Sequence, residues 1–219
     1  MSKIVPQKPF LIMLYGYPGS GKTYFARQFS ENVQTANLQA DRLRGELFEA
    51  PRYDKQENDV VAQLIDYMAE EFLSAGVSII YDTNAMRASQ RKSLREMARR
   101  HGAEPILIWL QTDIESAFLR NVKRDRRRAD DHYAAQWDRT TFDEVISHMQ
   151  NPEHHEEAAV VSGKHLYQTQ QSAVLTKLRD KGVLSSEDFS GHIAKPGMVN
   201  LVPQQPGRVD VSRRNIMIR

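Results

Sequence analysis

Apolar runs alternate with helical stripes along the first half of the chain. Residues 10–15, 77–81 and 105–110 are short, mostly apolar runs, which is the pattern of strands buried on both faces. Between them, residues 59–72 carry apolar side chains at three- and four-residue spacing, and residues 88–101 are rich in helix-forming side chains. Strands that alternate with helices predict an α/β fold with a parallel sheet.

Weaker signals extend this pattern. Residues 35–39 predict one further short strand. Thr112 and Thr141 are each followed three positions later by glutamate, the capping-box arrangement that predicts a helix start. From about residue 185, proline and glycine punctuate short β-prone pieces. We therefore expect one main domain over residues 1–184 and an irregular or β-rich appendage over residues 185–219.

Composition narrows the class of protein. The 219 residues are 40% hydrophobic and 26% charged, which is enough for a sizeable buried core. The absence of cysteine excludes disulfide scaffolds, thiolate zinc sites and cysteine nucleophiles. Neither a signal peptide nor a run of ~18 apolar residues is readable, so we expect a soluble, cytoplasmic protein without a membrane partner. The formal net charge of +2 is too small to imply a nucleic-acid partner by itself.

Residues 16–23, Gly-Tyr-Pro-Gly-Ser-Gly-Lys-Thr, match the phosphate-loop pattern GxxxxGK[ST] between a buried strand and a helix. The glycines let backbone N–H groups and the start of the helix converge on a phosphate. We expect Lys22 to reach the β- and γ-phosphates of ATP and Thr23 to join a Mg²⁺ shell. The alternative is a chance glycine turn with an exposed lysine. The predicted nucleotide site consists of Gly16, Pro18, Gly19, Ser20, Gly21, Lys22 and Thr23.

Asp82 follows the predicted strand at residues 77–81. In a parallel sheet, the carboxyl ends of the strands gather where the ligand lies. A carboxylate there can hold a Mg²⁺-bound water, so Asp82 is predicted to be the second metal contact beside Thr23. The alternative is an aspartate that caps the next helix.

Asp41 and Arg44 form a D-x-x-R pair after the predicted short strand, where a phosphate acceptor has to approach. A carboxylate can accept the proton of an attacking hydroxyl, and a neighbouring guanidinium can hold an anionic acceptor. Asp41 is therefore the candidate base and Arg44 the candidate acceptor contact. An ordinary salt-bridged helix start is the alternative.

Residues 120–128 carry six basic side chains against the single Asp125. On a helix, Arg120 and Arg124 share a face, so both can point into one phosphate site and neutralise charge on the transferred group. We predict catalytic roles for these two arginines only. A solvated face is the better interpretation of the remaining basic residues.

With these elements in order, the chain resembles the P-loop polynucleotide kinase and zeta-toxin-like group of kinases. The matching pieces within about residues 8–130 are the phosphate loop, residues 41–44, residues 81–84 followed by Arg91, and residues 119–124. The resemblance implies that Asp41 activates the acceptor hydroxyl and that Arg44 binds the acceptor's phosphate. It also implies that Arg124 belongs to an arginine-bearing helical lid over the ATP, at about residues 120–140. The implied fold is a P-loop NTPase with a five-stranded parallel sheet flanked by helices.

The sequence therefore predicts an ATP- and Mg²⁺-dependent kinase that transfers the γ-phosphoryl group to a hydroxyl of a nucleic acid, a nucleotide or another small acceptor. One alternative is a nucleotide-binding module that hydrolyses ATP slowly or not at all. Another is a zeta-type toxin that phosphorylates a nucleotide sugar and has an antitoxin partner. The arginine-rich segment at residues 208–219 either contacts an anionic acceptor or partner, or forms a solvated edge strand.

Three smaller features complete the sequence picture. Lys164 lies in a Ser-Gly-Lys-His stretch that lacks the rest of a phosphate loop, so we expect a turn before a helix. His154 and His155 are adjacent and would diverge on a helix, which argues against a metal site. Trp137 follows the arginine-rich run and is left open between a core role and a base-stacking role.

Overall fold

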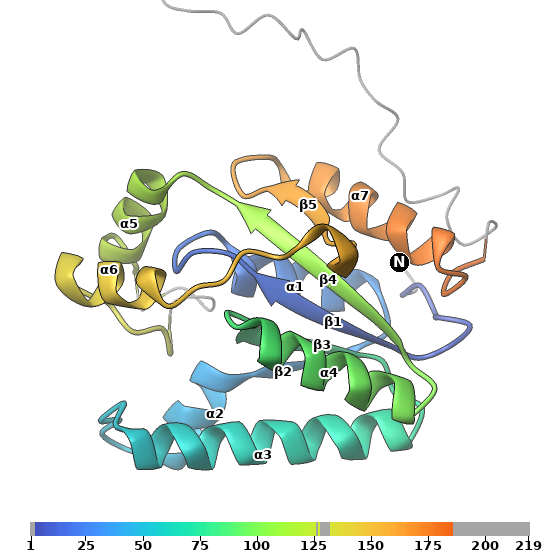
Figure 1. The fold of residues 1–219 in the computed structure, drawn as a ribbon, viewed down its shortest axis with the longest axis horizontal. Helices are drawn as coiled ribbons and strands as arrows, with labels where there is room; N and C mark the ends of the chain where they lie inside the picture. Colours follow the sequence, from blue (N-terminus) through green and yellow to red (C-terminus); the bar gives the residue numbers. More distant parts are fainter. Residues whose placement is uncertain (1–2, 126, 128–131, 186–219) are drawn as a thin grey trace, which may run out of the picture.

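The computed structural model describes residues 3–125, 127 and 132–185 (Figure 1). Seven α-helices, one short 3₁₀-helix and five strands alternate along this part of the chain. In chain order they are β1 (Phe10–Tyr15), α1 (Lys22–Asn32), β2 (Ala36–Gln39), α2 (Ala40–Leu47), α3 (Lys55–Ser74), β3 (Ile79–Asn84), α4 (Ala88–Arg100), β4 (Glu104–Gln111), α5 (Ile114–Val122), α6 (Arg139–Ser147), η1 (His154–Glu156), β5 (Ala159–Ser162) and α7 (Tyr167–Asp180).

The strands form one parallel sheet in the order β2-β3-β1-β4-β5. This confirms the α/β fold with a parallel five-stranded sheet, and β2 confirms the short strand predicted at residues 35–39. Strand β1 lies in the middle, where Met13 pairs with Tyr81 of β3 and with Leu107 of β4. Strand β5 has only four residues, too few to give a clear hydropathy pattern.

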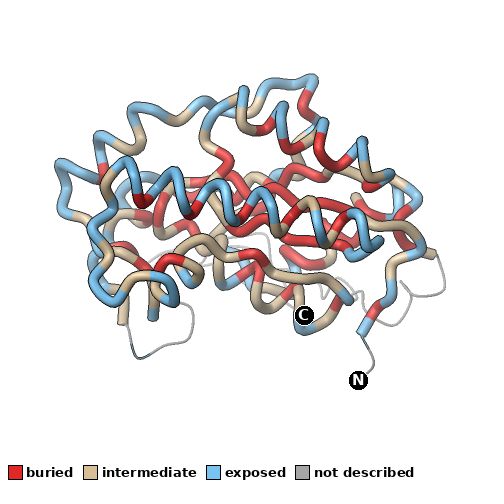
Figure 2. The backbone as a smooth tube through the Cα atoms, turned by 90° about the horizontal axis from the view of Figure 1, so that it is seen from below, coloured by how far each residue is buried: buried red, intermediate tan, exposed pale blue. Residues whose placement is uncertain are grey.

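Each face of the sheet is covered by its own helices. Even-numbered residues of β1, such as Ile12, join a core with Phe25 of α1 and Val174 of α7. Odd-numbered residues, such as Met13, join a second core with α3 and α4. Successive strand side chains point to opposite faces, so a continuous apolar run is what a two-sided sheet requires. Figure 2 shows the buried backbone concentrated in the central strands, with exposed positions on the outer sides of the helices.

The carboxyl ends of the strands all lie at one edge of the sheet. The phosphate-loop segment, the start of α2 and the connections after β3, β4 and β5 gather there, and α5 and α6 lie beyond the arrowheads of the strands (Figure 1). Ligands bind at this edge in open parallel sheets. The topology therefore brings the predicted site segments together although they are far apart in sequence.

Two helix starts differ from the sequence prediction. Helices α5 and α6 begin after Asp113 and Asp138, whose side chains accept hydrogen bonds of 2.8 Å from the N–H groups of Ser116 and Thr141. Thr112 and Thr141 are therefore not the caps. A carboxylate carries a full negative charge at the positive end of the helix dipole, which favours aspartate over threonine as the cap.

Strand β3 spans Ile79–Asn84, so Asp82 lies inside this strand rather than after it. The predicted boundary at residue 81 was too early because Asp82, Thr83 and Asn84 are polar and break the apolar run. They still occupy the carboxyl half of β3, at the edge of the sheet where a ligand binds.

The predicted helical lid and appendage are only partly within the described residues. Of the residues between α5 and α6, positions 123–125, 127 and 132–138 form no helix, and positions 126 and 128–131 lie outside the described part. Residues 186–219, which include the arginine-rich segment, lie outside it too, so the division into residues 1–184 and 185–219 stays a prediction. Across the described ranges, no helix is both long and apolar enough to cross a bilayer.

Candidate active site at the phosphate loop

The phosphate loop, residues 16–21, connects β1 to α1 through backbone that needs glycine. Gly19 and Gly21 have φ angles of 83° and 99°, in the left-handed region that side chains disfavour. A Cβ on Gly16 would overlap the Leu110 carbonyl, and a Cβ on Gly19 would overlap the Ala117 carbonyl. Glycine is therefore required for space as well as for φ. No side chain caps the start of α1, so its first N–H groups remain available to an anion.

Lys22 is directed back onto the phosphate loop. Its Nζ donates hydrogen bonds to the Gly16 carbonyl at 2.9 Å and to the Tyr17 carbonyl at 3.0 Å. Burial lowers the pKa of Lys22 to about 8, and the negative charge of Asp82 opposes that shift. The ammonium group is therefore the dominant form at neutral pH and can balance a phosphate charge.

Thr23 and Asp82 meet across the gap between α1 and β3. The Thr23 hydroxyl donates to Asp82 Oδ1 at 3.4 Å, and Asp82 is buried. A hydroxyl and a carboxylate are hard oxygen donors of the kind Mg²⁺ prefers. These two residues fit the predicted metal contacts, since both oxygens lie beside the phosphate-binding lysine.

Two residues that the sequence did not mark as site residues hold the phosphate loop in place. Asn84 Nδ2 donates a 3.0 Å hydrogen bond to the Gly16 carbonyl. Gly163, in the turn after β5, lies against the other side of the loop, because a Cβ there would overlap Thr112 and reach 2.5 Å from the Ser20 carbonyl. The predicted turn at residues 162–165 is therefore present, and its glycine packs against the phosphate loop.

Asp41 lies in the first turn of α2 and is half-buried. Burial raises the pKa of its carboxyl group, while the positive charges of Arg124, Arg44 and Lys22 act to lower it. Asp41 is thus within electrostatic reach of both the phosphate-loop lysine and Arg124. The topology brings the start of α2 to the same edge of the sheet as the phosphate loop, and the role of Asp41 as a base stays a prediction.

Arg44 lies one helical turn from Asp41, but its side chain is engaged with α3. It forms a buried ion pair with Glu57 and donates a 2.7 Å hydrogen bond to Asn58. The guanidinium also lies 4.7 Å from the centre of the Tyr53 ring. Its Nε finds no hydrogen-bond partner among the described residues. The Nε–H donor of Arg44 is thus buried without an acceptor in the part that the structure describes, on the helix that also carries Asp41.

Arg120 and Arg124 do not share a helical face, in contrast to the prediction. Helix α5 ends at Val122, so Arg120 lies in its last turn and Arg124 in the following connection. Arg120 donates to the Gly163 carbonyl at 2.9 Å, and Arg124 donates to the Ala135 carbonyl at 2.7 Å. Arg124 alone of the two contributes to the electrostatics of Lys22 and Asp41.

Arg91, which formed part of the sequence resemblance, is fully buried and bonded to protein groups. Its Nε and Nη2 donate to the two carboxylate oxygens of Glu156 at 2.9 and 2.8 Å. Its Nη1 donates to the carbonyls of Ala85, Met86 and Gln150. Arg91 therefore ties α4 to the segment after α6. In the same segment, His154 and His155 form part of η1, and the described residues contain no cluster of three potential metal ligands.

The sheet order, the phosphate loop and the gathering of lysine, threonine and aspartate beside it define a kinase-like P-loop NTPase. A family model described as an AAA domain (AAA_33) matches residues 11–152. The chain belongs to this AAA domain family, which confirms the resemblance to P-loop kinases.

Two curated relatives match about half of the chain. The L-seryl-tRNA(Sec) kinase of Methanococcus maripaludis is 24% identical over 119 residues, which cover 53% of this chain and 47% of that protein. The sulfate adenylyltransferase of Aspergillus oryzae is 30% identical over 112 residues, which cover 48% of this chain and 19% of that protein. The chain thus aligns with less than half the length of either relative.

Solved structures share the fold at low sequence identity. The APS kinase CysC of Mycobacterium tuberculosis, in complex with AMPPNP and APS, has a TM-score of 0.58 at 16% identity and covers 80% of this chain and 99% of its own. A sugar kinase from Janibacter gives 0.58 at 17%, covering 81% and 99%. Kti12 of Chaetomium thermophilum, in complex with ADP-AlF3, gives 0.59 at 18%, covering 78% and 97%.

Proposed function

We propose that this protein is an ATP- and Mg²⁺-dependent kinase that transfers the γ-phosphoryl group of ATP to a hydroxyl of a nucleic acid, a nucleotide or another small acceptor. The observation that carries the proposal is the position of Asp41 at the start of α2, at the same edge of the sheet as Lys22 and the Thr23–Asp82 contact. A module that only binds nucleotide needs the lysine, but it has no use for a half-buried carboxylate beside the terminal phosphate.

On the donor side, the phosphate-loop N–H groups and Lys22 hold the phosphates. To reach them, the ammonium group exchanges its hydrogen bonds to the Gly16 and Tyr17 carbonyls for bonds to phosphate oxygens. Thr23 and Asp82 would hold Mg²⁺, which neutralises phosphate charge when bound. The donor site is therefore assembled from α1 and β3.

On the acceptor side, Asp41 is the candidate general base. The acceptor oxygen forms a bond to the γ-phosphorus, the bond from that phosphorus to the β–γ bridging oxygen breaks, and the hydroxyl proton passes to Asp41. A carboxylate whose pKa is raised by burial is a better proton acceptor at neutral pH than a fully solvated one. Arg124 lies where it can offset negative charge on the transferred group.

Arg44 is the candidate contact for an anionic group of the acceptor, because its positive charge lies one helical turn from Asp41. Arg120 lies at the turn that carries Gly163, so it would act on the side of the bound nucleotide away from Asp41. The related L-seryl-tRNA(Sec) kinase and the fold shared with APS kinase support phosphoryl transfer to a hydroxyl.

The test compares Asp41→Asn with the wild type and with Asp59→Asn, an exposed aspartate on α3 that serves as the matched control. Labelled ATP and Mg²⁺ are supplied with a panel of acceptors that includes 5′-hydroxyl RNA and DNA, nucleosides and nucleotide sugars. Asp41→Asn should lose acceptor phosphorylation by about 10³-fold or more while its Kd for ATP stays within about twofold.

Wild-type turnover in Asp41→Asn would remove the base assignment. If the wild type releases no acceptor-dependent ADP on any acceptor, the kinase proposal fails and nucleotide binding alone remains. Phosphorylation confined to nucleotide sugars would favour the zeta-type activity.

A further inference from the structure

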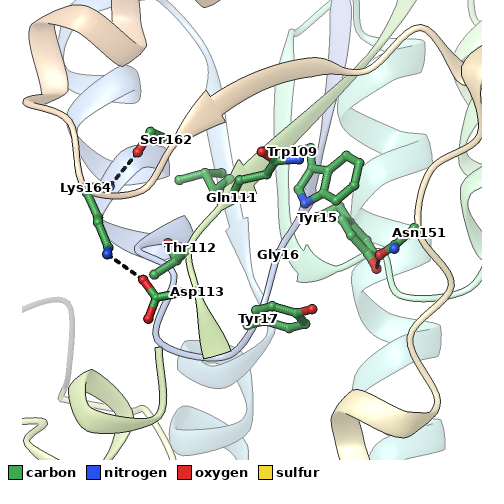
Figure 3. Close-up of a pocket in the computed structure, with 11 residues that line it drawn as sticks. Tyr15, Gly16, Tyr17, Trp109, Gln111, Thr112, Asp113, Asn151, Ser162 and Lys164 are labelled. Carbon is green, nitrogen blue, oxygen red and sulfur yellow. Dashed lines mark hydrogen bonds and ion pairs between the residues drawn. The ribbon is translucent and has the colours of Figure 1, made fainter. Parts of the chain in front are cut away.

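A cavity of about 420 Å³ opens beside the phosphate loop, on the side of β4 and β5 (Figure 3). Its walls come from the end of β1 with the start of the phosphate loop, the β4–α5 junction, the segment after α6 and the turn after β5. This volume lies within the range of small-molecule sites. None of the proposed catalytic residues lines it, so it is not the phosphate site itself.

Aromatic rings form one part of this cavity. Tyr15 and Trp109 lie side by side on neighbouring strands, with ring centres 5.5 Å apart and planes at 83°. Trp109 is only half-buried, although most of its neighbours on β4 are buried. Tyr17 of the phosphate loop lines the same cavity, and Figure 3 shows its ring below the other two in the view. Tyr15 is buried behind this wall, while Trp109 and Tyr17 keep part of their rings exposed, and such surfaces suit a flat ring that stacks on them.

Polar groups occupy the edges of the same cavity. The Tyr15 hydroxyl donates to Asn151 Oδ1 at 2.8 Å, which fixes the amide and leaves its NH₂ group to donate. Thr112 is 9% exposed, and its Oγ1 finds no hydrogen-bond partner in the described part of the chain. This hydroxyl is turned toward Gly163 and buried, so Thr112 shapes the wall of the cavity, while the amide of Asn151 is the group that a ligand can reach.

The remaining charges of the cavity cancel. Asp113 and Lys164 form an ion pair of 2.5 Å at its rim, drawn as a dashed line in Figure 3. This pair leaves no excess charge for a phosphate or carboxylate. The lining therefore favours an uncharged, planar group with hydrogen-bonding edges, which is the chemistry of a nucleobase.

We propose that this cavity binds the nucleobase of the phosphoryl acceptor, so that the acceptor is a nucleoside or contains one. That the bound molecule is the phosphoryl acceptor rests on the proposed kinase function, whereas the nucleobase site itself rests on the cavity alone. Asp41 follows β2, and the cavity lies over β1 and its neighbour β4. Strand β2 lies two strand spacings from β1 and three from β4, about 10 and 14 Å, a span that a molecule of nucleotide size can bridge.

Trp109 makes the site directly observable. The chain has two tryptophans, so a Trp137→Phe background leaves Trp109 as the single indole. Adenosine, guanosine, cytidine and uridine are titrated separately against its fluorescence, with ribose as the base-free control. A non-hydrolysable ATP analogue is present at saturation throughout to fill the donor site. At least one nucleoside should change the fluorescence saturably, and ribose should not.

Two substitutions locate the effect. Asn151→Ala removes the exposed hydrogen-bonding amide of the cavity and should weaken nucleoside binding about tenfold. Gln63→Ala, an exposed amide on α3, is the matched control and should leave binding unchanged. In turnover assays, Asn151→Ala should raise the KM of a nucleoside-containing acceptor and leave the KM of ATP unchanged.

The outcomes separate the two proposals. If no nucleoside changes Trp109 fluorescence, the nucleobase site is overturned even where phosphoryl transfer is found. It is also overturned if the ATP analogue displaces the bound nucleoside. Efficient transfer to an acceptor without a base, insensitive to Asn151→Ala, overturns it as well. If nucleosides bind as expected but no acceptor is phosphorylated, the base site stands and the kinase proposal fails.

Discussion

Two buried arginine–glutamate pairs on the α3 and α4 side of the sheet differ in how completely the arginine is satisfied. Arg91 bonds to Glu156 through Nε and Nη2 and to three backbone carbonyls through Nη1. Arg44 pairs with Glu57, but its Nε has no partner among the residues that the structure describes. Both arginines belong to the motifs that carry the family resemblance.

This difference separates an arginine that holds the fold from one that can serve a ligand. A buried donor left without an acceptor costs about 1–3 kcal/mol, so the fold satisfies Arg44 less completely than Arg91. Arg91 has no such donor in reserve and joins α4 to the segment near η1. Arg44 has one and lies a helical turn from Asp41.

The largest expected effect is the loss of the fully satisfied arginine. Arg91→Met removes the main charged partner of Glu156 and leaves only the partly exposed Arg95 beside it, and the Arg91 and Glu156 side chains are 0% and 1% exposed. The free energy of unfolding should fall by about 3–5 kcal/mol, measured by urea denaturation. The KM of the acceptor, determined on the folded fraction, should not change. A loss below about 1 kcal/mol would contradict the structural role of this pair.

Arg44 should behave in the opposite way. Arg44→Lys keeps the positive charge opposite Glu57 but removes the planar fork and the Nε donor. The KM of an anionic acceptor should rise about 10- to 100-fold, with the KM of ATP unchanged, in steady-state assays. Arg42→Lys, an exposed neighbour on α2, is the matched control. Equal KM values for Arg44→Lys and wild type would place Arg44 with Arg91 as a purely structural residue.

Acid pH gives a third comparison. Hydrogen bonds from Arg91 and Arg95 outweigh the effect of burial and lower the pKa of Glu156 from 4.5 to about 2. Because the folded-state pKa lies below the unfolded value, the stabilisation is present above pH 4.5 and is lost as the pH falls towards 2. The free energy of unfolding of wild type should therefore decrease with acidification more steeply than that of Glu156→Gln. Parallel curves would contradict this assignment.

The smallest effect is expected at Arg95. Its Nη1 also bonds to Glu156, but the side chain is 17% exposed and Arg91 already balances the carboxylate. Arg95→Ala should lower the free energy of unfolding by about 1 kcal/mol in the same urea assay. A loss as large as that of Arg91→Met would show that the two arginines share the role equally.

The parts of the molecule that depend on local pattern could be predicted from the sequence. The central strands, α3, α4 and the phosphate loop follow from apolar runs, helical spacing and glycines within a few residues of one another. The helix starts at Asp113 and Asp138 could not be separated from nearby threonines, because both residue types can cap.

The sequence pattern could not identify the glutamates that pair with Arg44 and Arg91. Glu57 follows Arg44 by 13 residues and Glu156 follows Arg91 by 65, and no periodicity links either pair. For the same reason the sequence could assign arginines to a kinase motif without separating the structural one from the candidate ligand contact. The cavity beside Trp109 likewise combines four segments that only the fold brings together.

The turn at Gly163 has a consequence for how the family's shared motif is built. The family match ends at residue 152, yet the wall against which the Ser20 carbonyl rests comes after that point. The glycine motif and the turn that packs against it thus lie in separate stretches of the chain. A substitution at residue 163 can therefore shift the phosphate loop while every residue of the glycine motif stays the same.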